Sequence, residues 1–97
     1  MMNYERPTHT FWMDFSIADR FGIDAIKDTY ERACEGWKHD YKMFTELVMT
    51  LNHKCWSYYE ENEAYCELYR ELFYDADSWV LDNYKGDALK HYLAVTD

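Results

Sequence analysis

The stretch DYKMFTELVMTLNHKCWSYYEE, residues 40–61, decides the fold because it is the longest regularly phased apolar segment of the chain. At about 100° per residue, its large apolar side chains fall within roughly a third of the helical circumference. They are Tyr41, Phe44, Leu47, Val48, Leu51, Cys55, Tyr58 and Tyr59. We therefore predict a central helix that buries this stripe and leaves Lys54 at the surface.

Helical spacing also recurs on the N-terminal side of this stretch. Thr10 is expected to cap a short helix that ends at Gly22 and whose broad apolar side must pack on another element. Its apolar residues are Phe11, Trp12, Phe15, Ile17, Ala18 and Phe21. A second helix is predicted from Asp24, as N-cap, to Trp37, with a turn at residues 38–40. One continuous helix over residues 24–61 is the alternative.

Two further helices are predicted on the C-terminal side. The first covers residues 63–84, and the Lys85-Gly86 step after it terminates the helix. It faces the core with a second regular apolar stripe. The stripe consists of Tyr65, Leu68, Tyr69, Leu72, Phe73, Ala76, Trp79 and Val80. A short last helix is expected after Asp87, as its cap, with Leu89, Tyr92 and Leu93 on the apolar side.

The composition suits one small helical domain. The chain has 97 residues, 48% of them hydrophobic, and only one Pro and three Gly with which to make β-turns. Short connections make consecutive helices antiparallel neighbours. We therefore predict an all-α fold over residues 1–97, namely an up-down-up bundle of the three longer helices with short flanking helices at both ends. Residues 1–9 are expected to form a loose lead-in.

The net charge and the cysteine spacing limit which ligands and which cellular compartment are expected for this protein. A formal net charge of −9 repels phosphate backbones and anionic lipid, so neither direct nucleic-acid binding nor membrane binding is expected. Three cysteines without a CxxC spacing favour reduced thiols in a cytoplasmic protein. Cys34 and Cys55 fall at core positions, whereas Cys66, beside the core stripe, is the candidate reactive thiol.

Several short runs resemble those of a set of small proteins carried by phages and mobile elements of gut bacteria. The runs are Phe11-Trp12-x-Asp14-Phe15-Ser16-Ile17-Ala18-Asp19, Ala25-Ile26-x-Asp28-Thr29-Tyr30, Thr45-Glu46-Leu47-Val48 and Leu51-Asn52-His53-Lys54. The resemblance covers most of the chain from Phe11 to Asp97. It implies an accessory role in a mobile element and assigns no site residue.

Known catalytic and metal-binding spacings are missing from the sequence. His39, His53 and His91 do not belong to a Glu-x-x-His or His-Glu-x-x-His pattern, and no Gly-x-Ser-x-Gly elbow or glycine-rich phosphate loop occurs. Glu35 with His39, and Asp87 with His91, have only the i, i+4 spacing of ordinary helix-face pairs. We therefore expect no enzymatic activity, no cofactor and no metal. A small metal-binding or enzymatic bundle is the least favoured alternative.

Two surfaces are candidates for contact with a partner. Residues 60–87 contain nine acidic and two basic residues, and their helix carries an acidic series at i, i+4 intervals that rises about 6 Å per step. The series is Glu63, Glu67, Glu71 and Asp75, with Asp82 close to the same stripe. The second surface lies on the central helix outside its core stripe and consists of Met49, Asn52, His53 and Trp56.

We interpret the acidic series as the partner-binding surface of a non-catalytic protein that works by protein-protein contact. Its spacing is of the order of that between successive phosphates, so it can imitate a nucleic-acid backbone towards a basic, nucleic-acid-binding protein. The plainer interpretation is an acidic helix that provides solubility. The alternative is a helical homo-oligomer with a structural role, in which the surface around Met49 and Trp56 is the seam.

Overall fold

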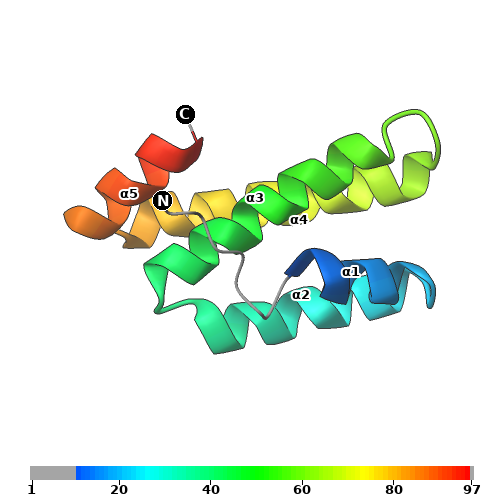
Figure 1. Ribbon diagram of the computed structural model, residues 1–97, viewed down its shortest axis with the longest axis horizontal. Coiled ribbons are helices and arrows are strands. Elements are labelled where there is room, and N and C mark those ends of the chain that lie inside the picture. The colour runs from blue at the N-terminus through cyan, green and yellow to red at the C-terminus, as the bar shows by residue number, and fades with distance from the viewer. Residues whose placement is uncertain (1–10, 97) are drawn as a thin grey trace, which may run out of the picture.

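The computed structural model describes residues 11–96, which form five helices and no strand. The helices are α1 (Phe11–Asp19), α2 (Ile23–Trp37), α3 (Tyr41–Ser57), α4 (Glu63–Asn83) and α5 (Asp87–Thr96) (Figure 1). The all-α class predicted from the sequence is therefore confirmed. Thr10 and the lead-in at residues 1–9 lie outside the described residues.

The two longest helices begin at polar caps. The Asp40 side chain accepts a hydrogen bond from the Met43 amide at 3.1 Å, and the Asn62 side chain accepts one from the Tyr65 amide at 3.1 Å. Each cap satisfies an amide that has no partner within its helix. A turn closed by the Asp40 amide and the Trp37 carbonyl, 2.9 Å apart, separates α2 from α3. Residues 24–61 are thus two helices.

Two of the predicted caps are wrong. The N-cap of α2 is Gly22, with a φ of 113° and no side-chain hydrogen bond, so Asp24 lies within the first turn. The positive φ explains the shift, because it suits glycine and the chain leaves α1 through it. Asp87 is itself the first residue of α5. Gly86 precedes it with a φ of 60°.

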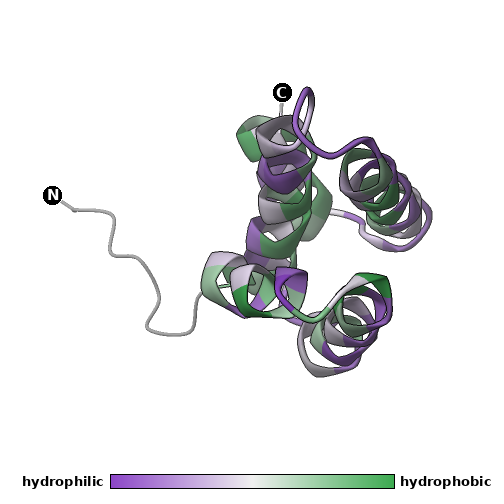
Figure 2. Cartoon of the chain, turned by 90° about the vertical axis from the view of Figure 1, so that its right-hand side faces the viewer, coloured by the Kyte–Doolittle hydropathy of each residue, from purple (hydrophilic) through white to green (hydrophobic). Residues whose placement is uncertain are grey.

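The core lies where α3 packs along α4, the most extensive helix pair of the structure. Phe44, Leu47, Val48 and Leu51 of α3 are almost fully buried there. α1 lies along α2, and α5 packs on α3 (Figure 1). The up-down-up order of the three longer helices stays an interpretation, because α2 pairs mainly with α1. Figure 2 shows hydrophobic residues on every helix, as expected of amphipathic helices.

Several residues depart from their predicted burial. Lys54, predicted at the surface, is only 3% exposed, whereas Tyr59 is 56% and Leu93 is 48% exposed. Tyr59 leaves the helical phase because α3 ends at Ser57. Of the three residues predicted on the apolar side of α5, Tyr92 is buried and Leu89 half-buried, and only Leu93 is exposed. Within the described part of the chain, no helix combines the length and apolar character that a membrane span requires.

Candidate functional site

The five carboxylates of the predicted partner-binding surface are all exposed on α4. We call this set, Glu63, Glu67, Glu71, Asp75 and Asp82, the acidic face. A step of four residues turns an α-helix by about 40° beyond a full turn, so the series drifts around α4 as it rises. Glu63, Glu67 and Glu71 form its continuous part, and Asp75 has drifted furthest from Glu63.

Asp75 has a partner inside the molecule. Its carboxylate accepts a hydrogen bond from the Tyr30 hydroxyl of α2 at 2.6 Å. Burial, and then this hydrogen bond to a carboxylate, raises the pKa of Tyr30. One carboxylate of the acidic face is therefore oriented towards α2. The remaining members are better placed for a partner.

An open cleft borders the N-terminal end of the acidic face. It has a volume of about 420 Å³ and lies at the loop between α3 and α4. Its lining combines four carboxylates with one guanidinium, a phenol and a thiol, from Tyr59, Glu60, Glu61, Glu63, Cys66, Glu67 and Arg70. The negative charge of the acidic face thus continues into the loop.

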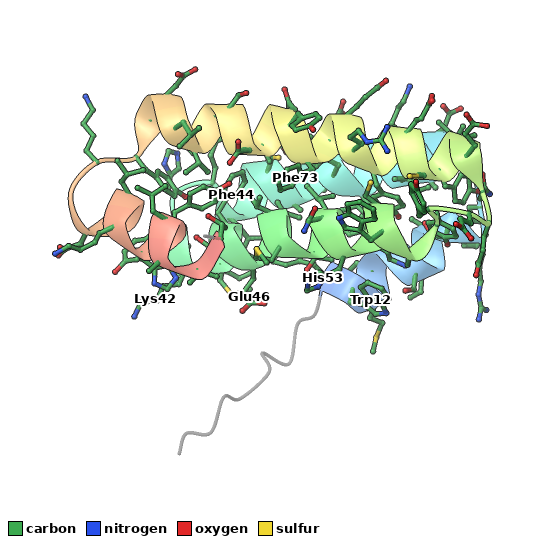
Figure 3. All side chains as sticks on the ribbon, turned by 90° about the horizontal axis from the view of Figure 1, so that it is seen from above. Trp12, Lys42, Phe44, Glu46, His53 and Phe73 are labelled. Atoms are coloured by element: carbon green, nitrogen blue, oxygen red, sulfur yellow. The ribbon has the colours of Figure 1, made fainter. Side chains whose placement is uncertain are left out.

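The alternative surface on α3 is only partly open. Met49 and Asn52 are half-buried, whereas His53 and Trp56 are exposed. Trp56 is 61% exposed, and its ring lies 5.4 Å from that of Tyr59, centroid to centroid. In Figure 3, the labelled side chains of His53 and of Trp12 on α1 are on the same side of the molecule. Among residues 11–96, neither α1 nor α5 covers Trp56.

An exposed apolar surface on α1 and the turn after it was not predicted from the sequence. Phe11, Phe15 and Ala18 pack inward, but Trp12, Ile17 and Phe21 are exposed, Phe21 by 77%. A short helix with apolar residues all round its circumference is typically buried on all sides. The breadth of the apolar pattern in residues 11–21 was the available signal. The pattern predicts packing but cannot show which side stays open.

A buried charged network was also missed. Lys54 Nζ lies 2.8 Å from Asp19 Oδ2 and donates a hydrogen bond to Ser16 Oγ at 2.8 Å. Asp19 also accepts hydrogen bonds from the hydroxyls of Tyr58 at 2.6 Å and Tyr69 at 2.5 Å. These contacts join residues 35 to 50 positions apart, so no local pattern could have revealed them.

The contact between Ser16 and Lys54 resembles a nucleophile beside a base, but its chemistry is different. The ammonium of Lys54 donates to both Asp19 and Ser16, and its Nζ lies 4.3 Å from the centre of the Trp12 ring. An ammonium that donates its protons has no lone pair with which to accept one from Ser16. The arrangement attaches α1 to α3 and provides no activated serine.

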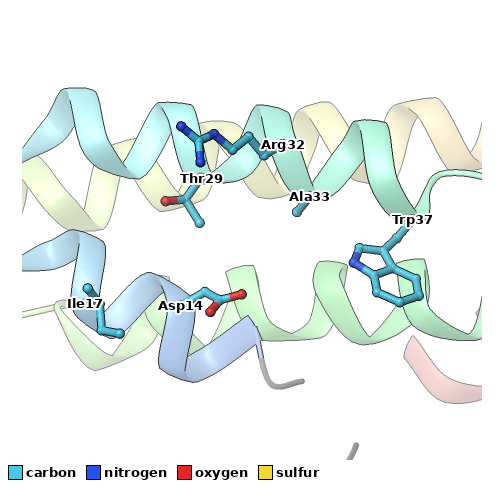
Figure 4. Close-up of a pocket in the computed structure, with 6 residues that line it drawn as sticks. All are labelled: Asp14, Ile17, Thr29, Arg32, Ala33 and Trp37. Carbon is cyan, nitrogen blue, oxygen red and sulfur yellow. The ribbon is translucent and has the colours of Figure 1, made fainter. Parts of the chain in front are cut away.

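A groove of about 370 Å³ runs between α1 and α2 (Figure 4). Ile17, Ala33 and Trp37 form its apolar part, and Asp14, Thr29 and Arg32 its polar part. Arg32 pairs with Asp28 at 3.0 Å, and both side chains are largely exposed. The groove therefore presents apolar and charged side chains together.

The histidines lie far apart along the chain. His53 is exposed on α3, and the ring of His91 on α5 packs against Tyr41 at 5.3 Å between centroids. Among residues 11–96, no group of three or more His, Cys, Asp and Glu side chains is arranged to hold a metal ion.

Comparison with protein-family models, with curated proteins and with solved structures finds no match to this chain.

Proposed function

We propose that this is a non-catalytic protein whose acidic face binds a basic partner, in the manner of a nucleic-acid mimic. The observation that carries the proposal is the run of exposed carboxylates Glu63, Glu67 and Glu71 on α4, one above another at i, i+4 positions. Like charges at this spacing destabilise a helix by a few tenths of a kcal/mol per pair. A cation-rich partner would offset that repulsion on binding.

The distribution of charge supports the same proposal. Residues 60–87 carry a net charge of −7, from nine acidic and two basic residues, which leaves −2 for the rest of the chain. A concentrated field of one sign steers an oppositely charged partner and speeds association. The resemblance to proteins of phages and mobile elements implies an accessory role in a mobile element, and a nucleic-acid-binding protein has the basic surface that the acidic face requires.

The test is affinity capture from a lysate of the organism that carries the gene, with wild type and two double variants as baits. E67K/E71K reverses the centre of the acidic face. E31K/E35K is a matched control, because Glu31 and Glu35 are also exposed and i, i+4 on α2. We expect wild type and E31K/E35K to retain the same basic protein and E67K/E71K to lose it. All three baits should give the same helical circular dichroism.

Two results would contradict the proposal. One is retention of the same partner by E67K/E71K at wild-type level. The other is equal loss with both double variants, which would show that net charge alone matters. Duplex DNA added as a competitor should displace the wild-type bait from its partner, since both occupy the same basic surface.

The second candidate function is a homo-oligomer with its seam on α3. It is favoured by the exposure of Trp56, because aromatic residues are enriched at the centres of interfaces. Sedimentation velocity on wild type and Trp56→Ala distinguishes the two proposals. A wild-type dimer that Trp56→Ala dissociates would support the oligomer, whereas a wild-type monomer over the accessible concentration range would exclude it.

A further inference from the structure

Two of the three cysteines meet inside the α3–α4 pair. The Sγ atoms of Cys55 on α3 and Cys66 on α4 lie 3.7 Å apart. The two side chains are only 6% and 4% exposed. Both are free thiols, at van der Waals distance on neighbouring helices. A modest movement would bring the sulfurs to the roughly 2.05 Å of a disulfide bond.

We propose that Cys55 and Cys66 form an oxidant-responsive dithiol site, in which hydrogen peroxide oxidises Cys66 and Cys55 then closes an intramolecular disulfide. The cleft that leads to this site shares Glu63 and Glu67 with the acidic face, but the dithiol chemistry does not require partner binding. Its test does not depend on a partner.

The surroundings of the two sulfurs differ, and the difference assigns their roles. Cys66 forms part of the lining of the open cleft at the α3–α4 loop, and Cys55 does not. Arg70 Nη2 donates a hydrogen bond to Cys66 Sγ at 3.7 Å. The guanidinium attracts the negative charge that Cys66 carries as it attacks an oxidant. Cys66 is thus the sulfur that reacts first.

Cys55 is suited to the second step. Burial raises the pKa of Cys55, the contact with Cys66 adds to the rise, and the nearby Arg70 guanidinium offsets only part of it. The raised pKa keeps Cys55 from attacking peroxide first, and its role in the second step rests on its contact with Cys66. It already touches the sulfur that it must attack. Proximity of this kind favours closure of the disulfide over escape of the intermediate.

The cleft also selects the oxidant. The side chains of Glu60, Glu61, Glu63 and Glu67 line the approach to Cys66. Their charge repels glutathione disulfide, which is anionic and bulky, but not hydrogen peroxide, which is neutral and small. Peroxide is therefore the class of oxidant that fits this entrance.

The chemistry balances in two steps. The Cys66 sulfur attacks one peroxide oxygen, the O–O bond breaks, and Cys66 becomes a sulfenic acid as one water is released. The Cys55 sulfur then attacks the Cys66 sulfur, the S–O bond breaks, and the oxygen leaves as a second water with the Cys55 proton. Overall, two thiols and one hydrogen peroxide give one disulfide and two waters.

Cys34 is an internal control. It is the third free cysteine and is half-buried on α2. Burial raises the pKa of Cys34, which makes its thiol unreactive at neutral pH. A non-specific oxidant would attack all three cysteines. The proposed site oxidises only two.

The experiment exposes folded wild-type protein to hydrogen peroxide or to the same concentration of glutathione disulfide, alkylates the remaining thiols, and identifies the products by peptide mass spectrometry. We expect peroxide to yield a peptide cross-linked through Cys55 and Cys66, with Cys34 alkylated. Glutathione disulfide should give this product more slowly. Arg70→Gln, a change at an exposed residue, should slow the peroxide reaction severalfold.

Single variants test the order of the steps. Cys55→Ser should accumulate a Cys66 sulfenic acid that dimedone traps, whereas Cys66→Ser should leave Cys55 reduced. Cys34→Ser should behave as wild type. Circular dichroism checks the fold of each variant, and Cys→Ala at the same positions serves if a serine variant unfolds. The proposal is overturned if wild type gives no Cys55–Cys66 cross-link, if Cys34 is oxidised first, or if the cross-link forms equally fast with glutathione disulfide.

Discussion

The charge of Lys54 is held inside the molecule by three side chains of α1. Asp19 supplies the counter-charge, Ser16 accepts a hydrogen bond, and the Trp12 ring covers the ammonium. Tyr58, Tyr65 and Tyr69 complete the network, since two donate to the Asp19 carboxylate and Tyr65 donates to its carbonyl at 2.9 Å. No buried side-chain nitrogen or oxygen is left without a partner among the described residues. The network therefore joins α1 to the α3–α4 pair.

Lys54→Met should destabilise the protein by about 3–5 kcal/mol, because it leaves the Asp19 carboxylate buried without its counter-charge. Urea titration followed by circular dichroism measures the change. Lys42→Met is the control, since Lys42 is exposed on the same helix, and it should cost less than about 0.5 kcal/mol. Equal midpoints for the two variants would refute the buried ion pair. Asp19→Leu combined with Lys54→Met should recover part of the loss.

Two leucine-to-alanine variants compare the stability contributed by a residue at the centre of the core with that contributed by a residue at its edge. Leu51 is fully buried in α3, so Leu51→Ala should cost about 2–5 kcal/mol. Leu72 of α4 is only half-buried against the core, so Leu72→Ala should cost clearly less than Leu51→Ala. Denaturant titration of both variants provides the comparison. If Leu72→Ala proved the more damaging, the core would be centred on α4 and not on α3.

At the scale of the elements, two glycines make a matched pair. Gly22 connects α1 to α2 with a φ of 113°, whereas Gly36 lies within helix α2, and a Cβ would meet nothing within 4 Å at either position. Gly22→Ala should therefore cost about 1–3 kcal/mol through backbone strain alone. Gly36→Ala should gain up to about 1 kcal/mol through helix propensity. Thermal melts compare the two, and melting temperatures shifted in the same direction would contradict this backbone conformation.

Helix positions could be predicted from the sequence because periodicity is local. The stripe that contains Phe44 and Leu51 identified α3, and the polar residues 38–40 marked the turn before it. The burial of Lys54 could not be predicted, because its partner Asp19 lies 35 residues away. The contact of Cys55 with Cys66 depends on how α3 packs on α4 and has no signature in the spacing of cysteines. The acidic face was visible because an i, i+4 series lies on one helix, but its contact with Tyr30 was not.

For the molecule as a whole, buried tyrosines predict a sharp alkaline limit of stability. Burial, and for each of them a hydrogen bond to a carboxylate, raises the pKa of Tyr30, Tyr58, Tyr69 and Tyr92. Burial and the charge of Asp40 raise the pKa of Tyr84 to about 12. The hydrogen bond of Tyr92 is to Asp77. These phenols stay protonated in the folded protein at pH values where the unfolded chain has ionised.

The sign of the effect follows from linkage. Because the folded pKa lies above the unfolded value of about 10, the stabilisation is complete below pH 10 and is lost as the pH rises through the folded values, by at most about 1.4 kcal/mol per pH unit for each tyrosine. We expect the ultraviolet absorbance of tyrosinate to rise in two phases, the later one coinciding with loss of helical circular dichroism. A single phase near pH 10 with the helices intact would show that the phenols are not buried.

The most direct measurement on the acidic face is the affinity for the captured partner as a function of salt. If the carboxylates of Glu63, Glu67 and Glu71 make the contact, wild-type affinity should fall by about tenfold or more between 50 and 200 mM salt. The affinity of the E31K/E35K variant should fall in parallel with that of wild type, while E67K/E71K should bind weakly at every salt concentration. A wild-type affinity that is unchanged over this range, or an E67K/E71K affinity equal to that of wild type, would contradict the account.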